Sequence, residues 1–146
     1  MNNSSDENAL PLSGITVVDL SRLVSGNVMT QVLADLGADV VKIEPPEKGD
    51  DLRAGKCKGV STYWLAYSRN KQSVSLDLRK QEDMAQLHGM LRQANILVEN
   101  FRPGTLERMG LDNAMLQSLN PRLVVIRISG WGIRRFNGRL PQKRRR

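Results

Sequence analysis

Residues 15–46 read ITVVDLSRLVSGNVMTQVLADLGADVVKIEPP, and this stretch decides the fold. Residues 15–20 are short, β-branched and apolar, which predicts a buried strand. After a Ser-Gly pair, apolar residues return at helical spacing as far as Gly37, a natural helix stop. Residues 39–43 predict a second strand, which the proline at Pro45 ends. A strand, a helix and a strand over this length predict a right-handed crossover and a parallel sheet.

The alternation of strands and helices continues through the rest of the chain. We expect a short helical turn that Thr105 caps, and a further helix that Asp112 caps. The other expected elements are strands at 73–78, 96–99 and 123–129, helices at 80–93 and 112–119, and a charged, glycine-containing loop at 46–62. This pattern predicts an α/β class, with a Rossmann-like parallel sheet and flanking helices.

The net charge of +7 is concentrated at one end of the chain. Residues 133–146 read IRRFNGRLPQKRRR and hold six arginines, one lysine and no acid, so residues 1–132 are neutral. We therefore expect three parts: a disordered leader at 1–10, an α/β domain at 11–132, and a basic, disordered tail at 133–146. The tail makes nucleic-acid binding one hypothesis, which the neutral body and the lack of interleaved aromatic residues disfavour.

Several features predict a cytoplasmic protein without a membrane span. Residues 1–9 are polar and acidic and lack the apolar region of a secretory signal. No apolar run approaches the roughly 18 residues that a span needs. Cys57 is the single cysteine, so no disulfide can form within one chain.

The chain lacks the common signatures of nucleotide and metal sites. Neither G-x-x-x-x-G-K-[ST] nor a G-x-G-x-x-G after the first strand is present. His88 and Cys57 are too few soft ligands for zinc, so no metal is expected, and each is read as an ordinary helix or loop residue. The acidic pairs at 50–51 and 82–83 are read as solvated or capping groups rather than general acids.

Five segments together resemble one family. They are PLSGITVVDLSRLVSG at 11–26, LADLGADVVKIEPPEKGDDLR at 33–53, YWLAYSRNKQSVSLDLR at 63–79, ILVENFRPGTLERMGL at 96–111, and LNPRLVVIRISGWG at 119–132. The fourth, with its NFRPG-x-LERMGL pattern, is the most specific. The chain resembles the CoA-transferases of family III, the CaiB/BaiF family, which includes formyl-CoA and carnitine-CoA transferases.

The resemblance implies a large α/β enzyme that works as an interlocked homodimer. Its substrates are an acyl-CoA and a carboxylic acid. In such an enzyme an aspartate carboxylate attacks the thioester to form a mixed anhydride, and CoA then returns as an aspartyl thioester that exchanges with the incoming acid. That aspartate lies further downstream than the fourteen residues that follow Gly132. We therefore expect a truncated form that is inactive alone and assign no catalytic residue.

The resemblance also carries over a set of CoA-binding residues. Arginines suit phosphate oxygens, and apolar side chains can flank an adenine ring. Two features count against the assignment: residues 100–104 could serve only to turn the chain, and Pro45 stands where relatives often have an arginine. The expected CoA-binding residues are Val24, Leu76, Asp77, Leu78, Arg79, Asn100, Phe101, Arg102 and Arg108.

Two further alternatives stay open beside the transferase. One is a CoA-binding module without catalysis, and the other is a fragment of an acyl-CoA racemase, because the N-terminal half does not separate these branches. The switch to arginine-rich sequence at 133–146 is also what a truncated or frameshifted reading frame would produce.

Overall fold

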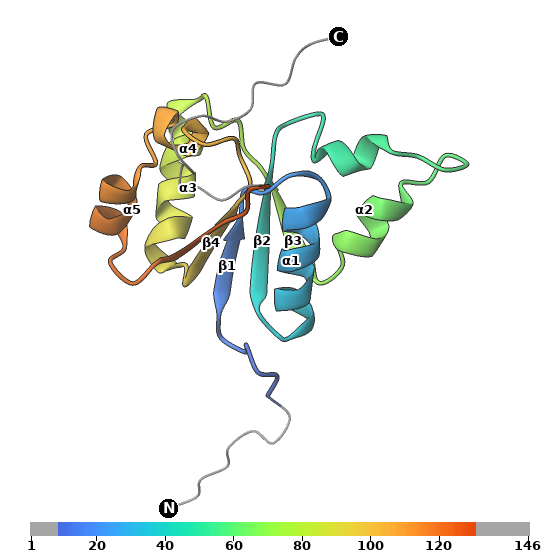
Figure 1. Cartoon of the computed structure of the whole chain (residues 1–146), viewed down its shortest axis with the longest axis horizontal. Helices are drawn as coiled ribbons and strands as arrows, with labels where there is room; N and C mark the ends of the chain where they lie inside the picture. Colours follow the sequence, from blue (N-terminus) through green and yellow to red (C-terminus); the bar gives the residue numbers. More distant parts are fainter. Residues whose placement is uncertain (1–8, 131–146) are drawn as a thin grey trace, which may run out of the picture.

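The computed structural model describes residues 9–130, which build a five-stranded parallel sheet in the order β3-β2-β1-β4-β5 (Figure 1). The strands are β1 Thr16–Asp19, β2 Asp39–Glu44, β3 Lys71–Ser75, β4 Ile96–Glu99 and β5 Val124–Arg127. The helices are α1 Leu23–Asp35, α2 Thr62–Tyr67, α3 Gln81–Gln93, α4 Thr105–Arg108 and α5 Asn113–Leu119, with a 3₁₀ turn, η1, at Asp51–Ala54. The predicted α/β class and parallel sheet are confirmed.

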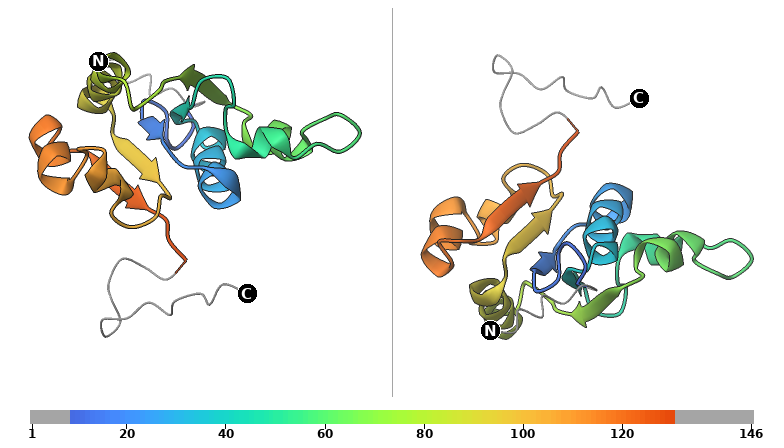
Figure 2. Two further views of the ribbon diagram at one scale, coloured as in Figure 1. Left: turned by 90° about the horizontal axis from the view of Figure 1, so that it is seen from above. Right: turned by 90° about the horizontal axis from the view of Figure 1, so that it is seen from below.

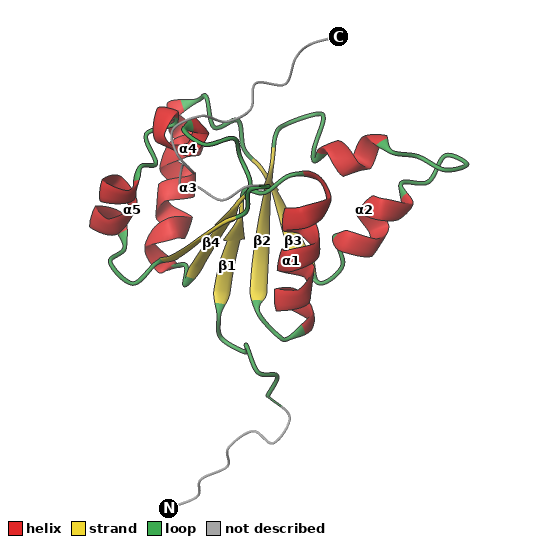
Figure 3. Ribbon diagram, in the orientation of Figure 1, coloured by secondary structure: helices red, strands yellow, loops and turns green. Residues whose placement is uncertain are grey.

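Helices lie on both sides of the sheet (Figure 3). Because side chains alternate along a strand, Val17 and Val18 of β1 enter different cores. Val18 packs with leucines of α3, α4 and α5, whereas Val17 packs with Ala34 and other residues of α1. The sheet is therefore the middle layer of three.

Most of the expected elements are confirmed to within a few residues. β4 and α3 match closely, and Asp112 caps α5 by accepting a hydrogen bond from the Met115 N–H at 2.8 Å. The third strand was predicted two residues too late, and β3 ends at Ser75. The chain turns there because Asp83 of α3 accepts the N–H of Asp77 at 2.7 Å.

Three local predictions were wrong. The helix predicted after Gly26 begins at Leu23, and Gly104 rather than Thr105 occupies the N-cap position of α4. The helix α2 was not predicted, because none of its residues is buried and it has no clear apolar stripe. It lies beside α1 and η1, and the adjoining loop projects away from the sheet (Figure 2).

Two of the predicted parts fall largely outside the described residues. These are residues 1–8 of the leader and the whole of the tail at 133–146, so both assignments remain predictions. Within residues 9–130, no helix is long and apolar enough to cross a membrane.

Candidate functional site

A groove of about 680 Å³ runs along the carboxyl edge of the sheet. The segments that follow β1, β2, β3 and β4 supply its walls, together with residues of α4 and the turn after it. The chain order reverses between β1 and β4, which are neighbours in the sheet. Ligands of open α/β sheets bind in the crevice at such a reversal, so this groove is the candidate site.

The groove has an apolar floor and a charged rim. Leu20, Ile43 and Leu76 are buried at its base, and Leu78 and Phe101 are partly buried against the same core. Basic side chains on the lining are Arg22, Lys48, Arg79 and Lys80. An apolar floor that includes the flat Phe101 ring suits the base of a nucleotide, and the cations on the rim suit its anionic phosphates.

Asp77 and Arg79 form a closed ion pair on the rim. The Arg79 Nε and Nη2 donate to the two Asp77 carboxylate oxygens at 2.8 and 2.9 Å. The side-chain hydrogen bond from Arg79 lowers the pKa of Asp77 to about 2. Arg79 therefore offers only part of its donor set to a ligand unless Asp77 releases it.

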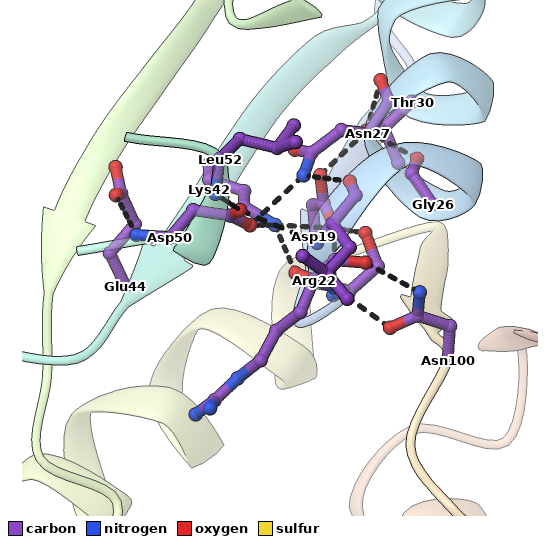
Figure 4. A network of polar contacts seen from close by, with 12 residues as sticks. Asp19, Arg22, Gly26, Asn27, Thr30, Lys42, Glu44, Asp50, Leu52 and Asn100 are labelled. Atoms are coloured by element: carbon purple, nitrogen blue, oxygen red, sulfur yellow. Dashed lines mark hydrogen bonds and ion pairs between the residues drawn. The ribbon is translucent and has the colours of Figure 1, made fainter. Parts of the chain in front are cut away.

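Asn100 ties the end of β4 to the turn after β1 across the reversal. Its Oδ1 accepts the Arg22 N–H at 2.8 Å, and its Nδ2 donates to the Arg22 carbonyl at 2.6 Å (Figure 4). Gly26 allows the first turn of α1 to pack against Ser21 of the same turn, since an added Cβ would lie 2.1 Å from Ser21 Cβ. The Asn100 side chain thus acts as a backbone clamp.

The predicted CoA-binding residues do not all meet in one place. Leu76, Asp77, Leu78 and Arg79 line the groove, as does Phe101. Phe101 also lines a second hollow of about 430 Å³ beyond the turn after β4, together with Asn100 and Arg102. The structure brings neither Val24 nor Arg108 to the lining of either hollow: Val24 is exposed in the first turn of α1, and Arg108 donates to Thr105 Oγ1 at 2.9 Å.

Sequence analysis missed Arg22, Lys48 and Lys80 on the groove. Arg22 could have been found from its position, because it follows the first strand at the edge where the carboxyl ends meet. Lys80 directly follows Arg79 in the chain, so the same lining segment simply runs one residue further.

A buried ionic network lies between α1 and the carboxyl ends of β1 and β2 (Figure 4). Lys42 Nζ of β2 lies 3.4 Å from Asp19 Oδ1 and 3.2 Å from Asp50 Oδ2, and all three side chains are almost fully buried. Lys42 also donates to the Ser21 carbonyl. The Thr30 hydroxyl donates to Asp19 Oδ2 at 2.6 Å. The network therefore fastens the turn after β1 to two strands and a loop.

Lys71 of β3 joins this network through residues of α1. Its Nζ donates to Thr30 Oγ1 at 2.6 Å and to the Asn27 carbonyl at 2.8 Å, and it lies 3.6 Å from Asp19 Oδ2. Desolvation by burial lowers the pKa of Lys71 to about 8 despite the nearby Asp19 carboxylate. In the interior, the negative charges of Asp19 and Asp50 thus compensate the positive charges of Lys42 and Lys71.

Of the acidic pair at 50–51, Asp50 serves as a cap, as predicted, whereas Asp51 pairs with Lys48. Asp50 accepts the Leu52 N–H at 2.9 Å and so caps η1, and Glu82 and Asp83 lie in the first turn of α3. His88 is partly buried in α3, and Cys57 is exposed. Within residues 9–130, no three His, Cys, Asp or Glu side chains are grouped so as to hold a metal ion.

The chain matches a known family over most of its length. A model of CoA-transferase family III matches residues 12–145. The match extends past residue 132, the last residue of the segments that resemble the family.

Relatives with assigned activities share this similarity. The succinyl-CoA–L-malate CoA-transferase alpha subunit of Chloroflexus aurantiacus is 42% identical over 127 residues, covering 84% of this chain and 30% of that protein. The acetyl-CoA:oxalate CoA-transferase of Acetobacter aceti is 42% identical over 124 residues, covering 84% of this chain and 32% of that protein. The chain therefore spans about a third of the length of the curated relatives it matches.

Solved structures agree with the sequence similarity. A CaiB/BaiF family protein from Brucella suis superimposes with a TM-score of 0.77 and 37% identity, over 85% of this chain and 34% of that one. Rv3272 from Mycobacterium tuberculosis gives a TM-score of 0.79 and 39% identity, over 85% of this chain and 35% of that one. The chain belongs to CoA-transferase family III.

Proposed function

We propose that the groove binds the nucleotide part of an acyl-CoA, and that the protein serves the transfer of CoA between an acyl-CoA and a carboxylic acid. One observation carries the proposal: the Leu76–Arg79 segment and Phe101, taken from two separate family motifs, line the same groove at the reversal of strand order. The named activities of the relatives support a transferase rather than a racemase.

The chemistry of the groove fits coenzyme A in kind. The apolar floor formed by Leu76, Leu78 and Phe101 can receive the adenine ring, and the basic rim can receive phosphates. Transfer is a separate step from binding, because it needs a carboxylate nucleophile to split the reaction into a mixed anhydride and an enzyme thioester. The groove would therefore supply the CoA-binding half of the chemistry.

Calorimetric titration of the chain with coenzyme A tests the binding proposal, once gel filtration has shown a species of defined size. We expect a dissociation constant in the micromolar range, with weaker binding for Arg79→Gln. Arg69→Gln is a matched control, because Arg69 is exposed, pairs with Asp35 and lies outside the groove. A folded, discrete species that binds no coenzyme A would overturn the proposal.

Two further readouts separate the alternatives. Incubation with succinyl-CoA and L-malate, followed by mass spectrometry of the CoA esters, reports transfer; binding without any exchange would favour a CoA-binding module. We also propose that the protein forms a homodimer, because apolar side chains are exposed on it: Val32 in α1, Leu36 at the end of α1 and Leu65 in α2. Light scattering, which measures the mass of the species in solution, tests this proposal.

A further inference from the structure

The basic side chains of the groove differ in whether they already have an acidic partner. Arg79 is paired with Asp77 at 2.8 Å, and Lys48 is paired with Asp51 at 2.6 Å. Arg22 and Lys80 have no ion pair within the described part of the chain. A ligand phosphate would meet these two cations without first displacing a carboxylate.

Arg22 differs from Lys80 in how firmly its backbone is held. The Asn100 amide binds both the N–H and the carbonyl of Arg22, at 2.8 and 2.6 Å. On the flanking residues, Lys42 donates to the Ser21 carbonyl and Asp50 Oδ1 accepts the Leu23 N–H at 3.3 Å. Asn100, Lys42 and Asp50 thus hold the backbone of this turn in place. The turn therefore loses little conformational freedom when a ligand binds, which favours binding.

The backbone beside Arg22 is also strained. Leu23 has φ of 60°, in the left-handed region that non-glycine residues seldom adopt. Such strain persists only where the surroundings determine the conformation, and it is concentrated at ligand-binding turns. Here the contacts from Asp50 and Asn100 supply that determination.

The Arg22 side chain is directed toward the groove. Its guanidinium carbon lies 5.8 Å from the centre of the Phe101 ring, and Figure 4 shows the side chain leaving the network of polar contacts that holds its backbone. The side chain is exposed and lines the groove next to the reversal of strand order. A guanidinium presents paired N–H groups that match two phosphate oxygens.

We propose that Arg22 is a phosphate-binding residue of the groove and that it contacts a phosphate of the nucleotide part of CoA. The inference rests on the proposed function, since it names a ligand contact within the same groove. It also assigns Asn100 a positioning role, acting on the ligand through the backbone of Arg22 rather than only through its own side chain.

The test compares Arg22→Gln and Arg22→Lys with the unaltered chain by calorimetry. Arg22→Gln removes hydrogen bonds between two charged groups, so it should weaken coenzyme A binding by at least about tenfold. Arg22→Lys should lose less, because it keeps the charge without the paired donors. Arg92→Gln is the control for net charge, since Arg92 is exposed in the last turn of α3 and does not line the groove.

A second ligand identifies the contact as one to phosphate. The Arg22→Gln loss should persist for ADP, which has two phosphates, and should vanish for adenosine, which has none. Because the Arg22 side chain has no hydrogen bond within residues 9–130 and only an exposed contact with the Phe101 ring, the denaturation midpoint should change little.

The outcomes separate the two proposals. Absence of coenzyme A binding by the unaltered chain would overturn the proposed function and this inference together. Binding by the unaltered chain with equal affinity in Arg22→Gln would overturn the inference alone. An equal loss for adenosine and for ADP would also overturn it, because the contact would then not be to a phosphate.

Discussion

The two faces of the sheet are built from the same strands but hold their helices by different means. On the face of α3, α4 and α5, buried leucines form a continuous apolar core that includes Leu87, Leu97 and Leu116. On the face of α1, the lower half of the sheet is apolar, through Val17 and Val40. Its upper half, next to the carboxyl edge, is ionic.

This difference shows where the geometry of the groove is determined. Apolar burial is non-directional, so the leucine face stabilises the fold without fixing individual loop atoms. Buried hydrogen bonds and ion pairs act only at defined distances and angles, so the ionic face fixes the turn after β1 and the loop that contains Asp50. The leucine face thus stabilises the fold, and the ionic face fixes the positions of the turn after β1 and of the Asp50 loop.

The largest effect is expected from removing the central cation of the ionic face. Lys42→Met leaves Asp19 and Asp50 buried without the charge that both share. Breaking a buried pair from one side typically costs about 3–5 kcal/mol, because the partner stays buried and uncompensated. Urea denaturation should show that loss in the free energy of unfolding.

The matched control for this prediction is Lys48→Met. Lys48 pairs with Asp51 but is 69% exposed, so its loss should cost less than about 1 kcal/mol. Equal losses in the free energy of unfolding from the two substitutions would mean that the burial of Lys42 does not make its ion pairs stronger than the exposed pair of Lys48. The proposed role of the ionic face would then be wrong.

A somewhat smaller loss is expected on the apolar face. Leu97→Ala removes a fully buried side chain from the middle of the leucine core, and such changes cost about 2–4 kcal/mol. Leu65→Ala, at a residue that is 61% exposed in α2, should change the free energy of unfolding by less than about 0.5 kcal/mol. If CoA binding survives Leu97→Ala in the folded fraction but not Lys42→Met, the division between stability and position is supported.

Much of the fold could be predicted from the sequence because its signals are local. The β-branched run at 15–20, the helical spacing before Gly37 and the capping aspartate Asp112 each act over a few residues. The strand, the helix and the cap were confirmed, although the helix begins earlier than predicted, at Leu23. The helix α2 was missed for a physical reason. Its residues bury little, so the apolar periodicity on which prediction depends is absent.

The candidate site could be predicted only in part. The groove residues around Leu76 and Phe101 were found because family motifs contain them. The ionic network was missed because its members come from β1, β2, β3, α1 and a loop, and no spacing along the chain brings them together. Lys71 shows the difficulty: in the sequence it is one lysine in a polar stretch, and only the fold buries it against Asp19.

The third prediction concerns the pH dependence of the ionic face. Burial lowers the pKa of Lys71 from 10.5 to about 8, so the folded state holds its proton less tightly than the unfolded state. Between about pH 8 and pH 10.5 the unfolded chain therefore binds more protons at this site, and the free energy of unfolding should rise with pH.

The comparison with Lys71→Met isolates this contribution. Asp19, Lys42 and Asp50 surround position 71 in both proteins, so the difference in stability between the two reports the charge of Lys71. The stability of the unaltered chain relative to the variant should increase from pH 8 to pH 10. A difference that stays constant over this range would show that Lys71 is not desolvated as the network requires.

The smallest effect is expected at the edge of the ionic face, where Arg53 covers Glu44. Arg53 donates to both carboxylate oxygens of Glu44, at 2.6 and 2.7 Å, and its guanidinium lies 3.8 Å from the centre of the Trp64 ring. Arg53→Lys keeps the charge but loses the paired donors and the flat stacking surface, which should cost about 1 kcal/mol.

This cost is smaller than that of Lys42→Met because Glu44 keeps other partners. The Ser73 hydroxyl donates to it at 2.5 Å and the Asp50 N–H at 2.7 Å. Burial alone would raise the pKa of Glu44, but the hydrogen bonds from Arg53, Ser73 and Asp50 together lower it below 4.5. The stability that this carboxylate contributes is present above about pH 4.5 and is lost as the pH falls. The stability gap between Arg53→Lys and the unaltered chain should therefore narrow between pH 7 and pH 3.5. A gap of constant size would assign the effect to stacking on Trp64 rather than to the ion pair.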